Sequence, residues 1–115
     1  MPFAIKRVYD PPASNDGHRI LVDRLWPRGV TKTRARVDEW LKEIAPSTEL
    51  RRWFHADPSR WAEFRSRYRH ELGDHAEAVA HVRALARKGR VTLLYGARDP
   101  EHNHAIVLKE FLGRK

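Results

Sequence analysis

Residues 19–25 form an apolar run typical of a buried strand, but the run carries Asp23 and Arg24 side by side near its end. Inside a sheet, each of these ions would lose favourable hydration unless it were paired and hydrogen-bonded. Trp26 and the Pro-Arg-Gly sequence of residues 27–29 follow at once and favour a turn. The stretch therefore predicts a strand whose carboxyl end opens into a binding or catalytic site.

The length of the chain, 115 residues, suits one compact domain, and we expect a single domain over residues 1–115. No run approaches the ~20 consecutive apolar residues of a membrane span, and residues 1–6 lack the apolar core of a secretory signal. These features predict a cytoplasmic protein without a membrane partner. The sequence contains no cysteine, which excludes disulfides, thiolate nucleophiles, iron-sulfur clusters and cysteine-bound zinc.

Runs of apolar and β-branched residues predict three strands, at residues 3–8, 19–25 and 91–95. Capping residues and apolar side chains at helical spacing predict about five helices. These are a helix capped by Thr33 that ends before Pro46, a short one from Ser47 through Phe54, one from Asp57 to Gly73, one from Asp74 to Gly89, and a last one that begins at Asn103 or His104.

This order of elements predicts an α/β fold, with a roughly three-stranded and mostly parallel sheet packed with about five helices. The long connection between the second and third strands allows a right-handed parallel crossover. The first two strands are joined by only about eight residues, a length typical of an antiparallel pair. Mixed pairing of the strands is therefore an open alternative.

Ordered motifs along nearly the whole chain resemble those of the DUF488 family, in its short YeaO-like branch. The motifs are Lys6–Pro12, Asp16–Gly17, Leu21–Gly29, Trp40–Ser47, Leu93–Ala97 and Asn103–Ala105. DUF488 is a domain of unknown function, so the resemblance implies a small α/β domain but no activity. It also implies that more distant members carry Cys-His-Arg at the place of residues 103–105. If those relatives use the cysteine as a nucleophile, this branch has lost that chemistry.

The carboxyl ends of the second and third strands predict one site at a shared edge of the sheet. The segment after the third strand leads into a helix N-terminus, where free N–H groups favour an anion. We expect the arginines to bind a phosphate, sulfate or carboxylate, Asp23 to orient Arg24, and Trp26 and Tyr95 to form apolar walls. The predicted ligand-binding residues are Arg7, Tyr9, Asp23, Arg24, Trp26, Arg28, Tyr95, Arg98 and Asn103. Alternatively, Asp23 and Arg24 brace the two loops against each other and Trp26 belongs to the core.

His104 is the candidate catalytic residue, because an imidazole with the ordinary pKa of about 6.5 titrates near neutrality. The alternative is that Asn103 and His104 only begin the last helix, with the side-chain oxygen of Asn103 accepting a backbone N–H bond. The chain has seven histidines, but their spacing matches no metal motif, and we predict no metal ligand. We expect no cofactor, because the sequence has no glycine-rich phosphate loop. Whether the protein is an enzyme stays open.

The formal net charge of +8 allows a second interpretation, a nucleic-acid-associated module. Arginines in residues 51–69 alternate with Trp53, Phe54 and Trp61, a mixture that suits base stacking and phosphate contacts. The helical spacing of Trp61, Phe64 and Tyr68 favours burial of these rings instead. A small anionic ligand is thus the first expectation and nucleic acid the second. A regulatory or scaffolding protein without a small ligand is the third.

Overall fold

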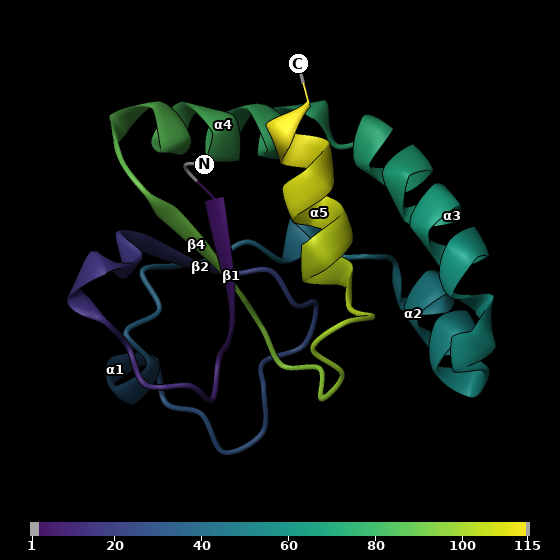
Figure 1. Ribbon diagram of the computed structural model, residues 1–115, viewed down its shortest axis with the longest axis horizontal. Coiled ribbons are helices and arrows are strands. Elements are labelled where there is room, and N and C mark those ends of the chain that lie inside the picture. The colour runs from purple at the N-terminus through teal and green to yellow at the C-terminus, as the bar shows by residue number, and fades with distance from the viewer. Residues whose placement is uncertain (1–2, 115) are drawn as a thin grey trace.

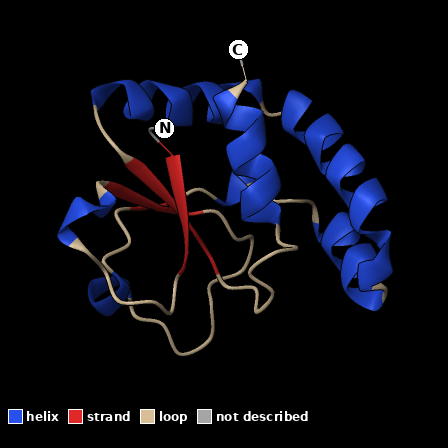
Figure 2. Ribbon diagram, in the orientation of Figure 1, coloured by secondary structure: helices blue, strands red, loops and turns tan. Residues whose placement is uncertain are grey.

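In the computed structural model, which describes residues 3–114, a parallel sheet is packed with five α-helices (Figures 1 and 2). The predicted α/β fold class is confirmed, with four strands where the sequence indicated about three. The strands are β1 (Phe3–Arg7), β2 (His18–Leu21), β3 (Glu39–Trp40) and β4 (Val91–Tyr95), in the order β1-β4-β2-β3. The helices are α1 (Lys32–Ala35), α2 (Thr48–Ala56), α3 (Trp61–Gly73), α4 (Ala76–Lys88) and α5 (His104–Gly113).

The central strand β4 is buried along its whole length and pairs in parallel with both β1 and β2. Of the two alternatives that the sequence left open, mixed pairing is therefore wrong, because every pair of strands is parallel and β1 and β2 are not neighbours. The connection at residues 8–17 does not join neighbours, because it passes from the end of β1 to the start of β2 on the other side of β4. Ten residues reach about 33 Å when extended, which is enough to return along a strand of about 17 Å.

The predicted helix between Thr33 and Pro46 is also wrong, because the chain leaves the helix at Arg36 and forms the edge strand β3 instead. The guanidinium of Arg19, which is almost fully buried, donates to the carbonyl of Ala35 at 2.7 Å and to that of Arg36 at 3.2 Å. The carboxylate of Asp38 accepts the backbone N–H of Arg19 at 2.9 Å. These bonds from β2 hold residues 37–40 in an extended conformation, although the spacing of the apolar residues in this segment predicts a helix.

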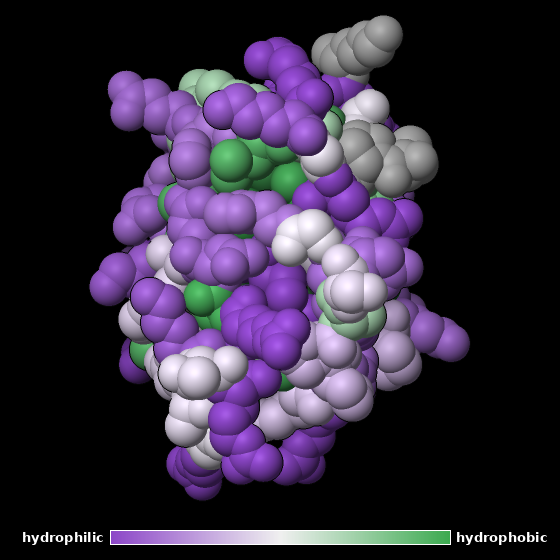
Figure 3. All heavy atoms as spheres, turned by 90° about the vertical axis from the view of Figure 1, so that its left-hand side faces the viewer, coloured by the Kyte–Doolittle hydropathy of each residue, from purple (hydrophilic) through white to green (hydrophobic). Residues whose placement is uncertain are grey.

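Two apolar clusters lie on the two faces of the sheet, as the alternation of side chains along each strand requires. Leu93 and Tyr95 of β4 pack into the larger cluster with helices α2 to α5, whereas Leu94 packs into the smaller one with Ala35 of α1. Helix α5 lies against β1 and β4, and α3 lies against α5. The surface of the molecule that faces left in Figure 1 is mainly hydrophilic, with small separate apolar areas (Figure 3).

Side-chain caps fix where several helices begin, as the sequence predicts. Ser47 accepts the N–H of Leu50 at the start of α2, and Asn103 accepts that of Ile106 at the start of α5. Asp74 is a wrong prediction, because it ends α3 rather than capping α4. Within residues 3–114, no helix has the length and apolar character needed to cross a membrane.

We expect Gly17→Ala to lower the free energy of unfolding by at least about 2 kcal/mol. Gly17 has a φ of +70°, and a Cβ placed there would lie 2.1 Å from the carbonyl oxygen of Arg90. Gly73→Ala is the control, since a Cβ at that helical position meets nothing within 4 Å. It should leave stability unchanged or raise it by up to about 1 kcal/mol. Urea unfolding of both variants measures the difference. Equal free energies of unfolding would contradict the claim that position 17 requires glycine.

Candidate functional site

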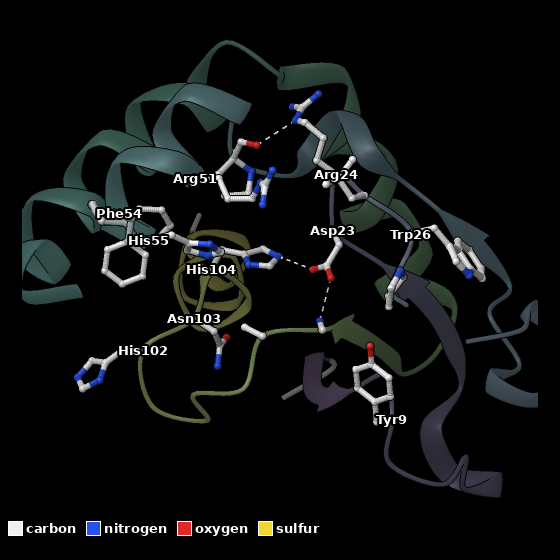
Figure 4. Close-up of a pocket in the computed structure, with 16 residues that line it drawn as sticks. Tyr9, Asp23, Arg24, Trp26, Arg51, Phe54, His55, His102, Asn103 and His104 are labelled. Carbon is white, nitrogen blue, oxygen red and sulfur yellow. Dashed lines mark hydrogen bonds and ion pairs between the residues drawn. The ribbon is translucent and has the colours of Figure 1, made fainter. Parts of the chain in front are cut away.

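A cavity of about 270 Å³ lies at the carboxyl ends of β2 and β4, between the loops that follow these strands and helix α2 (Figure 4). Its polar lining comes from one carboxylate, two guanidinium groups, three imidazoles, an amide and a phenol, and apolar side chains supply the remaining walls. The lining residues are Tyr9, Asp23, Arg24, Leu25, Trp26, Pro27, Pro46, Arg51, Phe54, His55, Phe64, Gly96, Ala97, His102, Asn103 and His104.

Asp23 joins three parts of the structure at the floor of this cavity. Its Oδ2 accepts the backbone N–H of Gly96 at 2.9 Å, and its Oδ1 lies 3.0 Å from Nε2 of His104. Its backbone carbonyl accepts the indole N–H of Trp40 at 2.7 Å. A Cβ at Gly96 would lie 2.8 Å from Oδ2, so a larger residue there would displace the carboxylate of Asp23. Asp23 thereby holds the ends of β2 and β4 together beside α5.

The position of its neighbours fixes the tautomer of His104. Nε2 lies 3.0 Å from the carbonyl oxygen of Val22 as well as 3.0 Å from Oδ1 of Asp23. Both neighbours are oxygen acceptors, so the geometry assigns a proton to Nε2. The N–H is aligned with Val22, which leaves Oδ1 of Asp23 buried without an aligned hydrogen bond.

Asn103 caps the N-terminus of α5, as the alternative interpretation of the sequence predicted. Its Oδ1 accepts the N–H of Ile106 at 3.1 Å, and its Nδ2 donates to the carbonyl of Asp99 at 2.9 Å. The side chain is buried and lines the cavity from the start of α5. Beside it, the ring of His102 packs edge-on against Trp61, with 5.0 Å between ring centroids.

The two arginines that line the cavity are held very differently. Arg24 donates from Nε to the carbonyl of Pro46 at 3.0 Å and from Nη2 to that of Ala45 at 3.3 Å. The prediction that Asp23 orients Arg24 is therefore wrong, because these carbonyls fix the guanidinium group. Arg51 reaches the cavity from α2, and within residues 3–114 its side chain makes no hydrogen bond.

The structure brings six of the ten predicted site residues to the cavity: Tyr9, Asp23, Arg24, Trp26, Asn103 and His104. The other four lie outside its lining. Arg7 donates to the carbonyls of Gly96 and Ala97 and supports the loop from behind. Tyr95 is buried in the core, and Arg28 and Arg98 point to solvent. Burial raises the pKa of Tyr95, in agreement with a core position.

Arg51 and His55 are two of the lining residues that sequence reasoning did not place at the site. They lie four residues apart on α2, so they share one face of the helix. Partial burial lowers the pKa of the His55 imidazole, and the nearby side chains of Arg51 and His104 lower it further. In the part of the chain that the structure describes, no group of three or more histidines and acidic residues is arranged to hold a metal ion.

Comparison with known proteins assigns the chain to a family. Residues 2–115 match the family model described as the inactive DUF488-N3 subclade. The chain belongs to the DUF488 family. It is 50% identical to the uncharacterized protein YeaO of Escherichia coli K12 over 112 residues, which cover 97% of each chain. It is 45% identical to the uncharacterized protein Rv3073c of Mycobacterium tuberculosis H37Rv over 108 residues, 94% of this chain and 91% of that protein. No solved structure gives a significant match.

We expect His55→Gln to change how stability depends on pH. The folded protein lowers the pKa of His55, so the unfolded state binds a proton more readily and the wild type loses stability as pH falls below about 6.5. Glutamine removes this loss, and the variant should gain stability relative to wild type between about pH 8 and pH 5.

Thermal unfolding across this pH range measures the effect, with His70→Gln on the exposed surface of α3 as the control. A difference between His55→Gln and wild type that is the same at both ends of the range would contradict the lowered pKa.

Proposed function

We propose that this protein binds a small organic anion in the cavity at the carboxyl ends of β2 and β4, and that it binds this ligand without turning it over. The observation that carries the proposal is the guanidinium group of Arg51. It lines the cavity, its Nε is buried, and no hydrogen bond to any described residue occupies it. Buried polar groups are almost always hydrogen-bonded, so a ligand with acceptor oxygens completes this site.

The surroundings of Arg51 favour an anion over a neutral ligand. Arg24 adds a second positive charge to the same lining, with two of its nitrogens already bonded to carbonyls and Nη1 left for a ligand. Apolar side chains such as Phe54 and Pro46 keep water away from part of the cavity, and Coulomb attraction is stronger in such surroundings than in water. The net charge of +8 attracts anions to the molecule as a whole.

Three observations support binding rather than turnover. The matching subclade is described as inactive, the chain has no cysteine, and the side chain of Asn103 is engaged in capping α5. Proton transfer by His104 stays a prediction, and so does a cytoplasmic location.

Nucleic-acid binding by the arginines of residues 51–69 stays the alternative, but the contacts of Arg60, Arg65 and Arg67 favour a structural role for these three. Arg65 pairs with Glu110 at 3.1 Å, and Arg67 pairs with Glu63 on its own helix. The guanidinium groups of Arg60 and Arg67 lie 5.0 and 4.4 Å from the ring centroid of Trp53. These arginines and this ring are therefore already engaged with partners inside the chain. A scaffolding role without a small ligand is the third proposal and has no specific contact in its favour.

The variant Arg51→Gln tests the proposal, with Arg52→Gln as a matched control. The two substitutions remove the same charge from adjacent positions of α2, but Arg52 is exposed and outside the cavity lining. Titration calorimetry with acetate, benzoate and inorganic phosphate at constant ionic strength measures binding. We expect at least one anion to bind wild type and Arg52→Gln equally, and Arg51→Gln at least about tenfold more weakly, as for the loss of a charge-assisted hydrogen bond. Equal affinity of both variants would overturn the proposal.

Binding of the anion should also take up protons at His55. A negative charge bound next to Arg51 favours the protonated imidazole, so affinity should rise as pH falls toward and below about 6.5. Calorimetry in two buffers of different ionisation enthalpy measures the proton uptake. The variant His55→Gln should bind with a flatter pH dependence, and an unchanged dependence would assign the proton to another group.

A further inference from the structure

We infer that the ligand of this cavity is a planar organic monocarboxylate with a single ring. The inference rests on the proposed function and adds the size, charge and shape of the anion. Each of these three properties comes from a separate observation on the cavity.

The volume of the cavity is large enough for a ring. A closed apolar cavity of ~150 Å³ holds benzene, so a space of about 270 Å³ has room for such a ring and a small polar group. Inorganic phosphate and acetate leave much of this space unfilled. A single six-membered ring that carries one carboxylate matches the volume.

The charges of the lining favour one negative charge over two. Among the guanidinium and carboxylate groups of the lining, Arg24 and Arg51 against Asp23 leave one positive charge in excess. The Oδ1 of Asp23 is buried and lacks an aligned hydrogen bond, so this carboxylate would repel a dianion more strongly than a monoanion. A monocarboxylate is planar and accepts two parallel N–H bonds from a guanidinium group, and the unpaired Arg51 is free to supply them.

The walls of the cavity favour a flat, apolar body on the anion. Phe54 of α2 and Phe64 of α3 stack with 4.5 Å between ring centroids and line the cavity on the helical side. Trp26 lies on the opposite side of the Asp23–His104 pair from Phe54 (Figure 4). Leu25 also lines the cavity, although 61% of its surface is exposed to solvent. Phe54 and Phe64 are already buried, and a ring against Leu25 and the partly exposed Trp26 would cover apolar surface that otherwise meets water.

Titration calorimetry with benzoate as the probe tests the inference, at constant ionic strength and about pH 7. Benzoate matches the volume and carries one charge, acetate lacks the ring, benzamide lacks the charge, and phenyl phosphate carries more charge. We expect benzoate to bind at least about tenfold more tightly than acetate, since the ring buries several carbon atoms. We also expect it to bind at least about tenfold more tightly than benzamide and more tightly than phenyl phosphate.

Two variants make the result specific to this cavity. Leu25→Ser changes an exposed side chain, so the variant should still fold. We expect it to lower the ratio of benzoate affinity to acetate affinity several-fold, because the ring loses an apolar contact. Arg52→Gln, outside the cavity, should leave that ratio as in wild type.

The possible outcomes separate this inference from the proposed function. If benzoate binds no more tightly than acetate, the inference that the ligand carries a ring is wrong. If phosphate or phenyl phosphate binds more tightly than benzoate, the inference of a single carboxylate is wrong. Either result would leave anion binding at Arg51 standing. No binding of any anion would overturn both. Benzoate binding that Leu25→Ser leaves unaltered would place the ring outside these walls and overturn the inference.

Discussion

The carboxylate of Asp23 is the interaction on which the arrangement of the cavity depends. It connects the end of β2 to the backbone N–H of Gly96 after β4, and it lies 3.0 Å from the imidazole of His104 at the start of α5. A half-buried carboxylate is expensive to desolvate, and it is retained here because one bond and one imidazole contact compensate for part of the lost hydration. The parallel ladder already places the ends of β2 and β4 side by side, and this one side chain joins the loops that follow them.

Two arginines, Arg19 of β2 and Arg51 of α2, show how differently the fold engages the same chemical group. Arg19 is 3% exposed, pairs with Asp16 and donates to the carbonyls of Ala35 and Arg36, so its hydrogen-bonding capacity is used within the fold. Arg51 lines the cavity and makes no hydrogen bond to the described residues. A saturated buried arginine stiffens the scaffold, whereas an arginine with free donors next to apolar walls is suited to recognise a ligand.

Local signals in the sequence predicted the parts of the fold that depend on neighbours along the chain. Ser47 and Asn103 cap α2 and α5 as expected, because a capping bond joins residues only a few positions apart. The apolar run at residues 91–95 was predicted as a strand and forms β4. The prediction was possible because a strand buried on both faces is apolar along its whole length. The segment after Thr33 was mispredicted, since bonds from Arg19, far away in sequence, override its helical spacing.

The sequence by itself determined the fold class, the starts of α2 and α5, the absence of cysteine chemistry, and the edge of the sheet at which polar side chains gather. Only the tertiary structure decided the strand order, the partners of Asp23 and Arg24, and the presence of Arg51 and His55 at the cavity. The physical reason is the range of the interactions. Capping and alternation are set within a few residues, whereas a site is set by which side chains from distant segments meet and which of their hydrogen-bonding groups the fold leaves unused.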